Sequence, residues 1–394
     1  MDKNSAIKLR YNYCGPISLS PLSCLLSTFN SRKIPNWEQL QARSVFTSYR
    51  CRTAINLVLP ALGIEKGSEV LVPAYNCGSE IDAILSTGAS VRFFDVNSDT
   101  KISIDNILSS ITSKTKAIYI IHYFGWPQKL EELRNICDQK GIVLIEDCAH
   151  ALFSSDSEGW IGRYGDASFF SLMKSLPVPD GAIAIVRKKL ELKLNKTNIS
   201  TTAVECVRLI RRSLIRYMSK NYFGVPAKLA AGTAYNSSNI GVTEIENIPD
   251  DYFYNESLMS NTKISPISLG IVNRINYSKI IEIRRCNYKR VYSGIIDLKN
   301  IRPLFSDLPQ GVCPLVFPLI VSDRNYWMAN LSRLGAHPIP WWSGYHPLLI
   351  DGPEFQSANM LKNKIVAIPV HQELSDNNID YIIACIRKIS KASK

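Results

Sequence analysis

The sequence predicts an α/β fold in which a mostly parallel sheet is covered by helices on both faces. Between Ser68 and Val186, short apolar runs alternate with stretches of helical periodicity. Runs such as AIYII are apolar at every position, which is typical of strands that are buried on both faces. The 394 residues suffice for more than one folding unit, and their composition is that of an ordinary globular protein.

The elements of this first part can be assigned in order. The predicted strands are SEVLVPA, SVRFFDV, AIYIIHYFG, IVLIEDCAH, ASFFSL and GAIAIV, and the predicted helices are GSEIDAILSTG, residues 104–113 and KLEELRNICDQKG. Strands joined through helices run parallel, and ligands of such sheets bind at the carboxyl ends of the strands. Asp147, His150 and Lys174 are therefore expected at the functional edge of the sheet.

Residues 190 to about 260 interrupt this pattern with a basic helical stretch and then a polar segment. In the basic stretch, an apolar side is expected to cover the core, and it consists of Val207, Ile210, Leu214 and Tyr217.

After residue 260 the α/β pattern resumes. One long helix is expected over residues 267–292, followed by a strand (CPLVFPLIV), a helix (RNYWMANLSRLG), an aromatic loop (WWSGYHP) and a last helix (IDYIIACIRKIS). The domains expected from these patterns are an N-terminal segment 1–40, a large domain 41–260 with a basic helical insertion at about 190–245, and a smaller C-terminal α/β domain 261–394.

The net charge of +12 is spread along the chain and is densest between Arg187 and Lys220. A solvated helix surface is one explanation, an anionic substrate such as a nucleotide diphosphate is another, and contact with a membrane surface is a third. No nucleic-acid-binding signature is present, so no nucleic-acid partner is expected.

The cysteines and the apolar runs indicate in which cellular compartment the protein is found. The ten cysteines show no CxxC or CxxH spacing, which predicts reduced thiols in a cytoplasm and no metal site. The N-terminus has no apolar signal core, and no run reaches the 18 or so apolar residues of a transmembrane helix. We therefore expect a cytoplasmic protein without a membrane span.

A lysine and an aspartate at the edge of such a sheet, together with the start of a helix, suit the chemistry of pyridoxal phosphate (PLP). A lysine amine forms a Schiff base with the PLP aldehyde, a carboxylate keeps the pyridine nitrogen protonated, and helix-terminal N–H groups bind the phosphate. Each part also has an ordinary explanation, because Asp147 can cap a helix and Lys174 can be a solvated loop residue.

Five segments in register from about residue 45 to residue 390, with a gap over residues 190–260, resemble the DegT-type sugar aminotransferases, a branch of the fold-type-I PLP enzymes. The segments are RTAINLVLPALGIEKGSEVLVPAYNCGSEIDAILSTGASVRFFDV, TKAIYIIHYFGWPQKLEEL, IEDCAHAL, FFSLMKSLPVPDGAIAIV and VAIPVHQELSDNNIDYIIACIRK. The resemblance implies a fold-type-I transferase with a large domain, a smaller C-terminal domain, and PLP as cofactor.

The resemblance also implies a role for each matching residue. Lys174 matches the Schiff-base lysine, Asp147 the partner of the pyridine nitrogen, and His150 the position, often glutamine, near the phenolic oxygen of the cofactor. The implied phosphate-binding residues are Arg52, Thr53 and Ser171 of the same chain, together with Asn261, which lies in a segment that reaches the partner subunit. A plain helix-capping role for Asn261 is the alternative.

Several positions depart from the family pattern. Cys51 replaces the usual glycine of the phosphate turn, and Cys77 replaces an aromatic residue that stacks on the pyridine ring, for which Tyr75 and Tyr123 are candidate substitutes. The stretch before the lysine is about two residues short, which affects the match of Ser171. After the lysine, the stiff turn PVP is expected to fix the amine, and Gly181 to let the next strand approach closely.

The implied activity is transfer of an amino group from glutamate to the keto group of a nucleotide-linked sugar, in the synthesis of surface polysaccharide or antibiotic sugars. The implied assembly is a homodimer with shared active sites. Trp341, Trp342 and Tyr345 either line the sugar or base pocket or are packing residues. Two alternatives stay open: another PLP reaction on sugars, such as the dehydration that accompanies deoxygenation, and a non-catalytic regulatory relative, which the sequence Arg50-Cys51-Arg52 favours.

Overall fold

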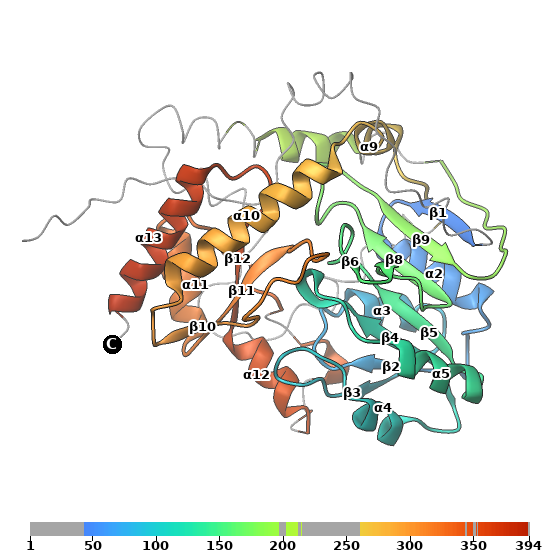
Figure 1. Cartoon of the computed structure of the whole chain (residues 1–394). Helices are drawn as coiled ribbons and strands as arrows, with labels where there is room; N and C mark the ends of the chain where they lie inside the picture. The colour runs from blue at the N-terminus through green and yellow to red at the C-terminus, as the bar shows by residue number, and fades with distance from the viewer. Residues whose placement is uncertain are drawn as a thin grey trace, which may run out of the picture.

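A computed structural model describes residues 43–196, 202–211, 214, 261–342, 345–349, 352 and 354–392. The N-terminal segment 1–40 and the junction near residue 260 lie outside the described residues. The described chain forms a seven-stranded sheet and a three-stranded sheet, which lie side by side with helices packed on them (Figure 1).

The large sheet has the strand order β1-β9-β8-β5-β4-β2-β3. Its strands are β1 (Ser44–Ser48), β2 (Glu69–Pro73), β3 (Ser90–Phe94), β4 (Thr115–Ile121), β5 (Val143–Asp147), β8 (Ala167–Ser171) and β9 (Ala182–Val186). In this sheet β9 alone runs against the other strands, since it pairs antiparallel with both β8 and β1. The predicted mostly parallel α/β sheet is therefore confirmed.

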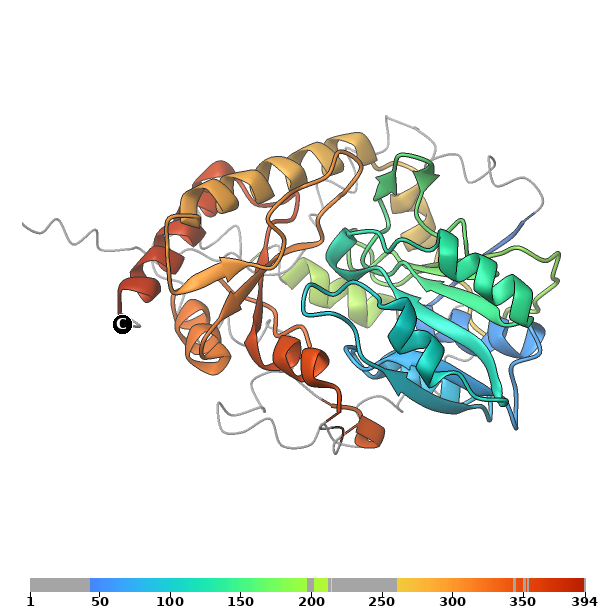
Figure 2. The same ribbon diagram turned by 60° about the horizontal axis from the view of Figure 1, so that its bottom comes forward.

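Helices cover both faces of this sheet, as Figures 1 and 2 show. They are α2 (Cys51–Ala61), α3 (Ser79–Leu85), α4 (Ile104–Ser110) and α5 (Glu131–Lys140). The central strand β4 is buried from Ala117 to Ile121, which explains why its sequence is apolar at each of these positions. Between β5 and β8 the chain forms a small hairpin of β6 (Ser155–Asp156) and β7 (Gly159–Trp160).

The C-terminal part is built on the antiparallel sheet β10-β11-β12, with strands β10 (Ile301–Pro303), β11 (Val316–Val321) and β12 (Ile365–Pro369). Its helices are α10 (Tyr277–Ile295), α11 (Arg324–Arg333), α12 (Gln356–Lys364) and α13 (Asp376–Ala392). One apolar core, which includes Tyr288, Phe317, Trp327 and Ile382, joins these helices to the sheet. The helix α10 extends from this part toward the large sheet (Figures 1 and 2).

The single helix predicted over residues 267–292 is wrong, because two helices occupy this stretch. The first, α9 (Pro266–Val272), has Ser265 as its N-cap, and the second, α10, starts anew after Asn276. The Asn276 side chain accepts a hydrogen bond from the backbone N–H of Lys279, and this capping bond satisfies one of the donors at the start of a new helix.

The predicted apolar side of the basic stretch is also wrong for the residues that can be checked. A helix is present over residues 202–211, but Val207 and Leu214 are exposed by 66% and 57%, and Ile210 by 40%. The buried side of this helix instead includes Leu209 and Thr202. Tyr217 lies outside the described residues.

Among the helices of the described segments, none combines the length and the apolar character that crossing a membrane requires.

Candidate active site

The residues predicted for the site gather at the carboxyl ends of β5 and β8. Asp147 is the last residue of β5, Ser171 is the last residue of β8, and Lys174 follows three residues later. The Cys51 thiol, at the start of α2, interacts with the side chains of all three. The first turn of α2 and the two strand ends therefore converge on one place, as the sequence pattern predicts for this edge of the sheet.

Lys174 and His150 are in direct contact. The Lys174 Nζ lies 3.0 Å from the His150 Nε2, and the His150 Nδ1 accepts a hydrogen bond of 3.2 Å from the backbone N–H of Phe124. Burial, together with the nearby Lys174, lowers the pKa of His150 well below its usual value, so the ring is neutral near pH 7.

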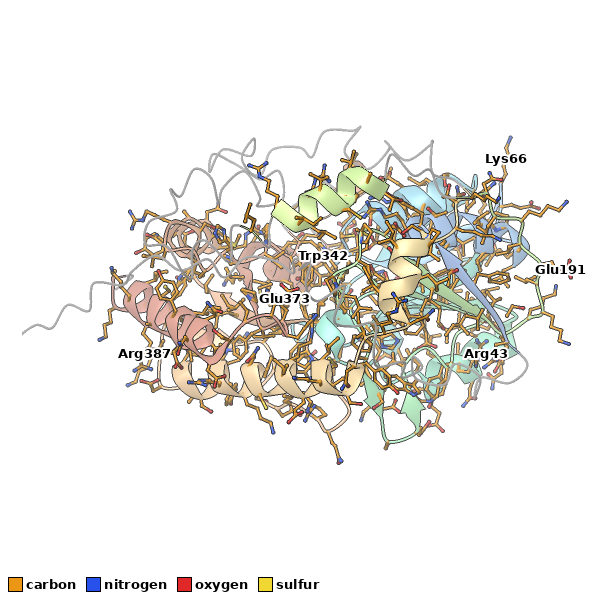
Figure 3. All side chains as sticks on the ribbon, turned by 90° about the horizontal axis from the view of Figure 1, so that it is seen from above. Arg43, Lys66, Glu191, Trp342, Glu373 and Arg387 are labelled. Atoms are coloured by element: carbon orange, nitrogen blue, oxygen red, sulfur yellow. The ribbon has the colours of Figure 1, made fainter. Side chains whose placement is uncertain are left out.

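Two tryptophans from the C-terminal part cover this pair. The Trp341 ring stacks on the imidazole of His150 with centroids 4.7 Å apart and planes 14° apart, and its centroid lies 5.8 Å from the Lys174 Nζ. Trp342 packs against His150, Tyr75 and Tyr123. Figure 3 shows Trp342 where the C-terminal part meets the large sheet. The aromatic loop thus contacts the site itself.

Asp147 is held by two donors. Its Oδ2 accepts from the Tyr119 hydroxyl at 2.9 Å, and its Oδ1 accepts from the backbone N–H of Ala149 at 2.8 Å. Burial raises the pKa of Asp147, and the charge of Lys174 opposes that shift. Tyr119 was missed by the sequence analysis, although a single hydroxyl within the apolar run AIYII was a usable signal.

The predicted phosphate turn lies at the N-terminus of α2. Arg52 and Thr53 are in the first turn of this helix, where backbone N–H groups lack partners within the helix. Arg50 is the N-cap, and its guanidinium contacts Met173 Sδ at 2.8 Å and Glu205 Oε1 at 3.8 Å. The helix at residues 202–211 therefore reaches the turn through Glu205.

The turn after Lys174 is fixed from the C-terminal part by a fully buried arginine. Arg284 of α10 donates to the carbonyl oxygen of Ser175 at 3.2 Å and to the carbonyl oxygens of Pro314 and Leu315. The side-chain amide of Gln372 donates to the same Ser175 oxygen at 3.0 Å. The backbone next to the candidate catalytic lysine is therefore held by two side chains of the C-terminal part.

Gly181 allows the close approach that the sequence analysis expected. Its φ is +128°, and a Cβ atom at this position would lie 2.8 Å from Leu172 Cδ1 and 2.9 Å from Ile264 Cδ1. Its backbone N–H donates to the Tyr49 carbonyl oxygen at 2.8 Å. The turn after the lysine is thus bonded to the segment that precedes α2.

Asn261 lies beside the phosphate turn of its own chain and does not contact the other predicted residues. It is exposed, has a φ of 69°, and accepts a hydrogen bond from the backbone N–H of Asn195 at its carbonyl oxygen. The carbonyl oxygen of the next residue, Thr262, accepts from the backbone N–H of Tyr49. Its side chain is therefore not placed at the site within one chain.

Cys77 faces an acidic partner. Its Sγ donates to Glu80 Oε2 at 2.8 Å, and burial, together with Glu80, raises the pKa of the thiol to about 12. The candidate stacking residues Tyr75 and Tyr123 lie with ring centroids 5.3 Å apart, and the Tyr123 hydroxyl donates to the Tyr75 carbonyl oxygen. The rings of both tyrosines pack against the Trp342 ring.

A second buried amine, Lys362, lies near this loop and was missed by the sequence analysis. Its Nζ donates to the Asn76 carbonyl oxygen at 2.9 Å and lies 4.9 Å from the centroid of the Tyr345 ring. Burial lowers the pKa of Lys362 to about 8. A buried lysine with a lowered pKa could also form the Schiff base that is assigned to Lys174.

One buried cluster has the donor atoms of a metal site, namely His122, Glu146 and Cys148. The His122 Nδ1 accepts from the backbone N–H of Gln128, so its Nε2 carries the proton and donates to Glu146 Oε2 at 2.9 Å. The same carboxylate oxygen accepts from the backbone N–H of Gly162. These bonds engage the ring and the carboxylate in joining β4, β5 and the loop before β8.

Comparison with known proteins agrees with the fold and the motifs. Residues 38–189 match the sequence model of the DegT/DnrJ/EryC1/StrS aminotransferase family. The GDP-perosamine synthase of Escherichia coli O157:H7 is 33% identical over 177 residues, which are 42% of this chain and 49% of that protein. The GDP-perosamine synthase of Vibrio cholerae is 28% identical over 179 residues, 45% of this chain and 46% of that protein. The chain thus spans about half the length of the curated relatives it matches.

Solved structures resemble the chain over nearly its whole length. The PLP form of Spr1654 from Streptococcus pneumoniae has a TM-score of 0.69 at 19% identity and covers 97% of this chain and 99% of its own. The aminotransferase TlmJ from Streptoalloteichus hindustanus has a TM-score of 0.65 at 20% identity, with 95% of this chain and 92% of its own covered. The fold is therefore that of these enzymes, and residues 38–189 carry the sequence of the DegT/DnrJ/EryC1/StrS aminotransferase family, as the motifs indicated.

Proposed function

We propose that the protein is a PLP-dependent aminotransferase that moves an amino group from glutamate to the keto group of a nucleotide-linked sugar. The observation that carries this proposal is the contact of Lys174 with His150 at the strand ends, next to Asp147 and the start of α2. The family match of residues 38–189 supports the reaction class, and the PLP form of Spr1654 supports the cofactor.

The side chains and backbone N–H groups at the site match the groups of PLP that a protein has to bind. Lys174 supplies the amine that binds the aldehyde, and the Asp147 carboxylate suits the pyridine nitrogen. The His150 ring presents one nitrogen to the same space, where the phenolic oxygen is expected. For the phosphate, the proposed groups are the first N–H groups of α2, the side chains of Arg52 and Thr53 in its first turn, and the hydroxyl of Ser171 at the end of β8. When bound, PLP stabilises the negative charge that develops on the substrate carbon after a proton leaves it.

Each residue of the site then has a separate proposed role. With PLP bound, Lys174 would move a proton to and from the substrate carbon, and Asp147 would hold a proton on the pyridine nitrogen. Trp341 and Trp342 pack on His150, which is buried, and Trp341 lies over the Lys174 amine, which stays partly exposed.

The substrate class is proposed from the relatives and from the charge. The two curated relatives are GDP-perosamine synthases, whose name contains a nucleotide-linked amino sugar, and the net charge of +12 suits a diphosphate. Such a reaction belongs to the synthesis of surface polysaccharides or antibiotic sugars. A cytoplasmic location is proposed with it, and the free thiols of the described cysteines support that location.

Turnover on a panel of GDP- and TDP-linked keto sugars, with glutamate as donor, tests the proposed function. We expect formation of an amino sugar and 2-oxoglutarate in equal amounts for at least one sugar. Loss of the sugar hydroxyl without transfer of nitrogen would instead identify a dehydratase. Absence of both products, although PLP is bound, would identify a non-catalytic relative.

We also propose a division into a large domain, residues 41–260, and a small domain, residues 261–394. The supporting observation is that the seven-stranded sheet is confined to residues 44–186 and the three-stranded sheet to residues 301–369. The part of the proposed basic insertion that is described is helical over 202–211 and has no helix over 190–196.

A homodimer with shared sites completes the proposal. Asn261 is exposed, and the carbonyl oxygen of the next residue, Thr262, accepts from Tyr49 just before the phosphate turn, a position that is compatible with a contact to a neighbouring subunit. If Asn261 binds the phosphate in the partner subunit, Lys174→Ala and Asn261→Ala proteins, each inactive alone, should complement when their subunits exchange. The mixed dimer then contains one site with both residues intact.

The measurement is amino transfer by the mixture after exchange has been verified by mass spectrometry of tagged subunits. Activity close to one working site per mixed dimer is expected. Demonstrated exchange without activity, or full activity of Asn261→Ala alone, contradicts the shared site.

A further inference from the structure

The short helix at residues 202–211 carries an apolar face that is exposed. Val204 and Val207 are exposed by 57% and 66%, and Ile210 and Leu214, which continue the same spacing, by 40% and 57%. Intervals of three and four residues put side chains on one side of a helix. In Figure 1 this helix is the yellow-green ribbon at the surface beside α9. Four apolar side chains therefore face away from the described part of the protein.

The opposite side of this helix is anchored to the protein. Leu209 is buried and belongs to an apolar cluster that includes Leu172, just before the candidate catalytic lysine, and Ile271 of α9. Glu205 lies 3.8 Å from the guanidinium of Arg50, the N-cap of α2. Because these inner contacts fix the orientation of the helix, its outer side is presented away from the core.

Basic side chains accompany the exposed apolar ones. Arg208 and Arg211 are both exposed, and the Arg208 guanidinium pairs with Glu205 at 2.7 Å. In the sequence, residues 187–220 contain ten Lys and Arg against two Glu, a net charge of +8 within a total of +12 for the whole chain. An exposed apolar face within the most basic stretch of the chain indicates a partner that is both apolar and negatively charged.

We propose that the outer side of this helix docks the protein on the surface of a bilayer that contains anionic phospholipids. The apolar side chains enter the boundary between headgroups and acyl chains, and the arginines contact the phosphates. The stem of an arginine side chain is apolar, so it lies beside the apolar residues while its charge stays at the headgroups. This surface, the docking face, consists of Val204, Val207, Arg208, Ile210, Arg211 and Leu214.

A second copy of the chain suits the docking face less well. In a twofold contact the same face of both subunits is brought together, so Arg208 and Arg211 of one copy would lie close to those of the other. Like charges in such a contact oppose association. A nucleic acid would pair with the arginines and leave the apolar side chains without a partner. A bilayer offers anionic headgroups with an apolar layer beneath them, and it therefore matches both kinds of residue.

Flotation of the full chain with lipid vesicles tests the proposal. The vesicles consist of phosphatidylglycerol mixed with phosphatidylcholine, or of phosphatidylcholine alone, and bound protein is measured against lipid concentration. We expect binding to the anionic vesicles and at least about tenfold weaker binding to phosphatidylcholine alone, because the arginines then lose the attraction of the anionic headgroups. A wild-type protein that floats with neither kind of vesicle would overturn the proposal.

Two double variants test which residues make this contact. Glutamine is the replacement, since it is polar, uncharged and a good helix former. Val207→Gln/Leu214→Gln removes apolar surface, and Arg208→Gln/Arg211→Gln removes charge. Each is expected to weaken binding to the anionic vesicles at least about tenfold. Binding that is undiminished in both variants would mean that another surface meets the lipid, which contradicts the docking face.

Two further double variants are matched controls. Leu108→Gln/Ile296→Gln removes two exposed apolar side chains from α4 and from the end of α10, and Lys66→Gln/Lys140→Gln removes two exposed charges of the large-sheet part. Both controls are expected to bind the anionic vesicles like the wild type. Equal losses in the controls and in the docking-face variants would show that binding depends on overall composition, and the docking face would again be refuted.

Light scattering and hydrogen exchange separate a membrane contact from a contact between subunits. If Val207→Gln/Leu214→Gln turns a lipid-free dimer into a monomer, the face is a subunit interface and the proposal is wrong. In the wild type, anionic vesicles are expected to slow amide exchange in the peptide that contains the docking face and to leave α4 unchanged. Unchanged exchange in that peptide would also contradict the proposal. None of these measurements involves amino transfer, so their outcome and that of the proposed function are independent.

Discussion

Replacing Lys174 with alanine is expected to reduce amino transfer by more than about 1000-fold while the fold remains intact. The Lys174 Nζ contacts His150 and the Trp341 ring, and the backbone of its turn is held separately by Arg284 and Gln372. Loss of this side chain therefore removes a chemical group and leaves the packing of the turn in place. Amino transfer and the thermal unfolding temperature should be measured on the same preparation.

The Lys174→Ala protein should still bind PLP without a covalent link, through Asp147 and the first turn of α2. Lys66→Ala is the control, because Lys66 is an exposed lysine of the same domain. A Lys174→Ala protein with wild-type activity and an unchanged spectrum of lysine-linked PLP would show that another residue holds the cofactor.

Asp147→Asn is expected to keep the covalent link to PLP and to lower the rate of amino transfer by at least about 100-fold. An amide cannot hold a proton on the pyridine nitrogen, so the charge that develops during proton transfer is less well stabilised. Asp138→Asn is a suitable control, because Asp138 lies on the exposed side of α5. A rate within about threefold of the wild type would show that Asp147 has only a structural role at the end of its strand.

The same variant should be more stable than the wild type when PLP is absent. Burial raises the pKa of Asp147 in the folded state above its unfolded value, so the folded state binds this proton more tightly. The stability that this proton contributes is present at low pH and is lost as the pH rises through the folded pKa. Above the folded pKa of Asp147 a neutral asparagine avoids the burial of charge, and the gain in unfolding temperature should vanish on acidification below that pKa. A gain of the same size at every pH would contradict this explanation.

The sequence predicts the sheet and the place of the site well, because both depend on local patterns. Strand β4 is recognisable since each residue from Ala117 to Ile121 is buried, and Asp147 is recognisable as the polar residue that ends such a run. The polar residues after neighbouring parallel strands must then lie at one edge. The position of Lys174 and His150 at this edge follows from this rule, whereas their direct contact is seen only in the structure.

What the sequence does not predict are the contacts between distant segments. Trp341 stacks on His150, and Arg284 donates to Ser175, across separations of more than a hundred residues that no periodicity encodes. The N–H of Phe124 reaches His150 only because its backbone is left-handed, which is unexpected for a phenylalanine. The final geometry of the site therefore depends on how the two parts of the chain pack.

Local patterns do not predict the structure where one helical spacing of apolar residues fits two different arrangements. The stretch from Ile267 to Tyr292 is compatible with one helix, and the capping bond of Asn276 is what divides it. In the basic helix, apolar spacing alone selects Val207 and Leu214 as buried, yet both are exposed, and Leu209 is buried instead. Helical spacing defines a side of the helix but does not say which side meets the core.

The most direct test of the account is to find which lysine holds the cofactor. The purified protein is incubated with PLP, the link is fixed by reduction with borohydride, and the modified peptide is identified by mass spectrometry. Lys362 makes the result decisive, because it is a second buried lysine whose pKa burial lowers to about 8. The account predicts the cofactor mass on the peptide that contains Lys174, and its loss in Lys174→Ala. Attachment to Lys362 with none at Lys174, or no attachment at all, would contradict it.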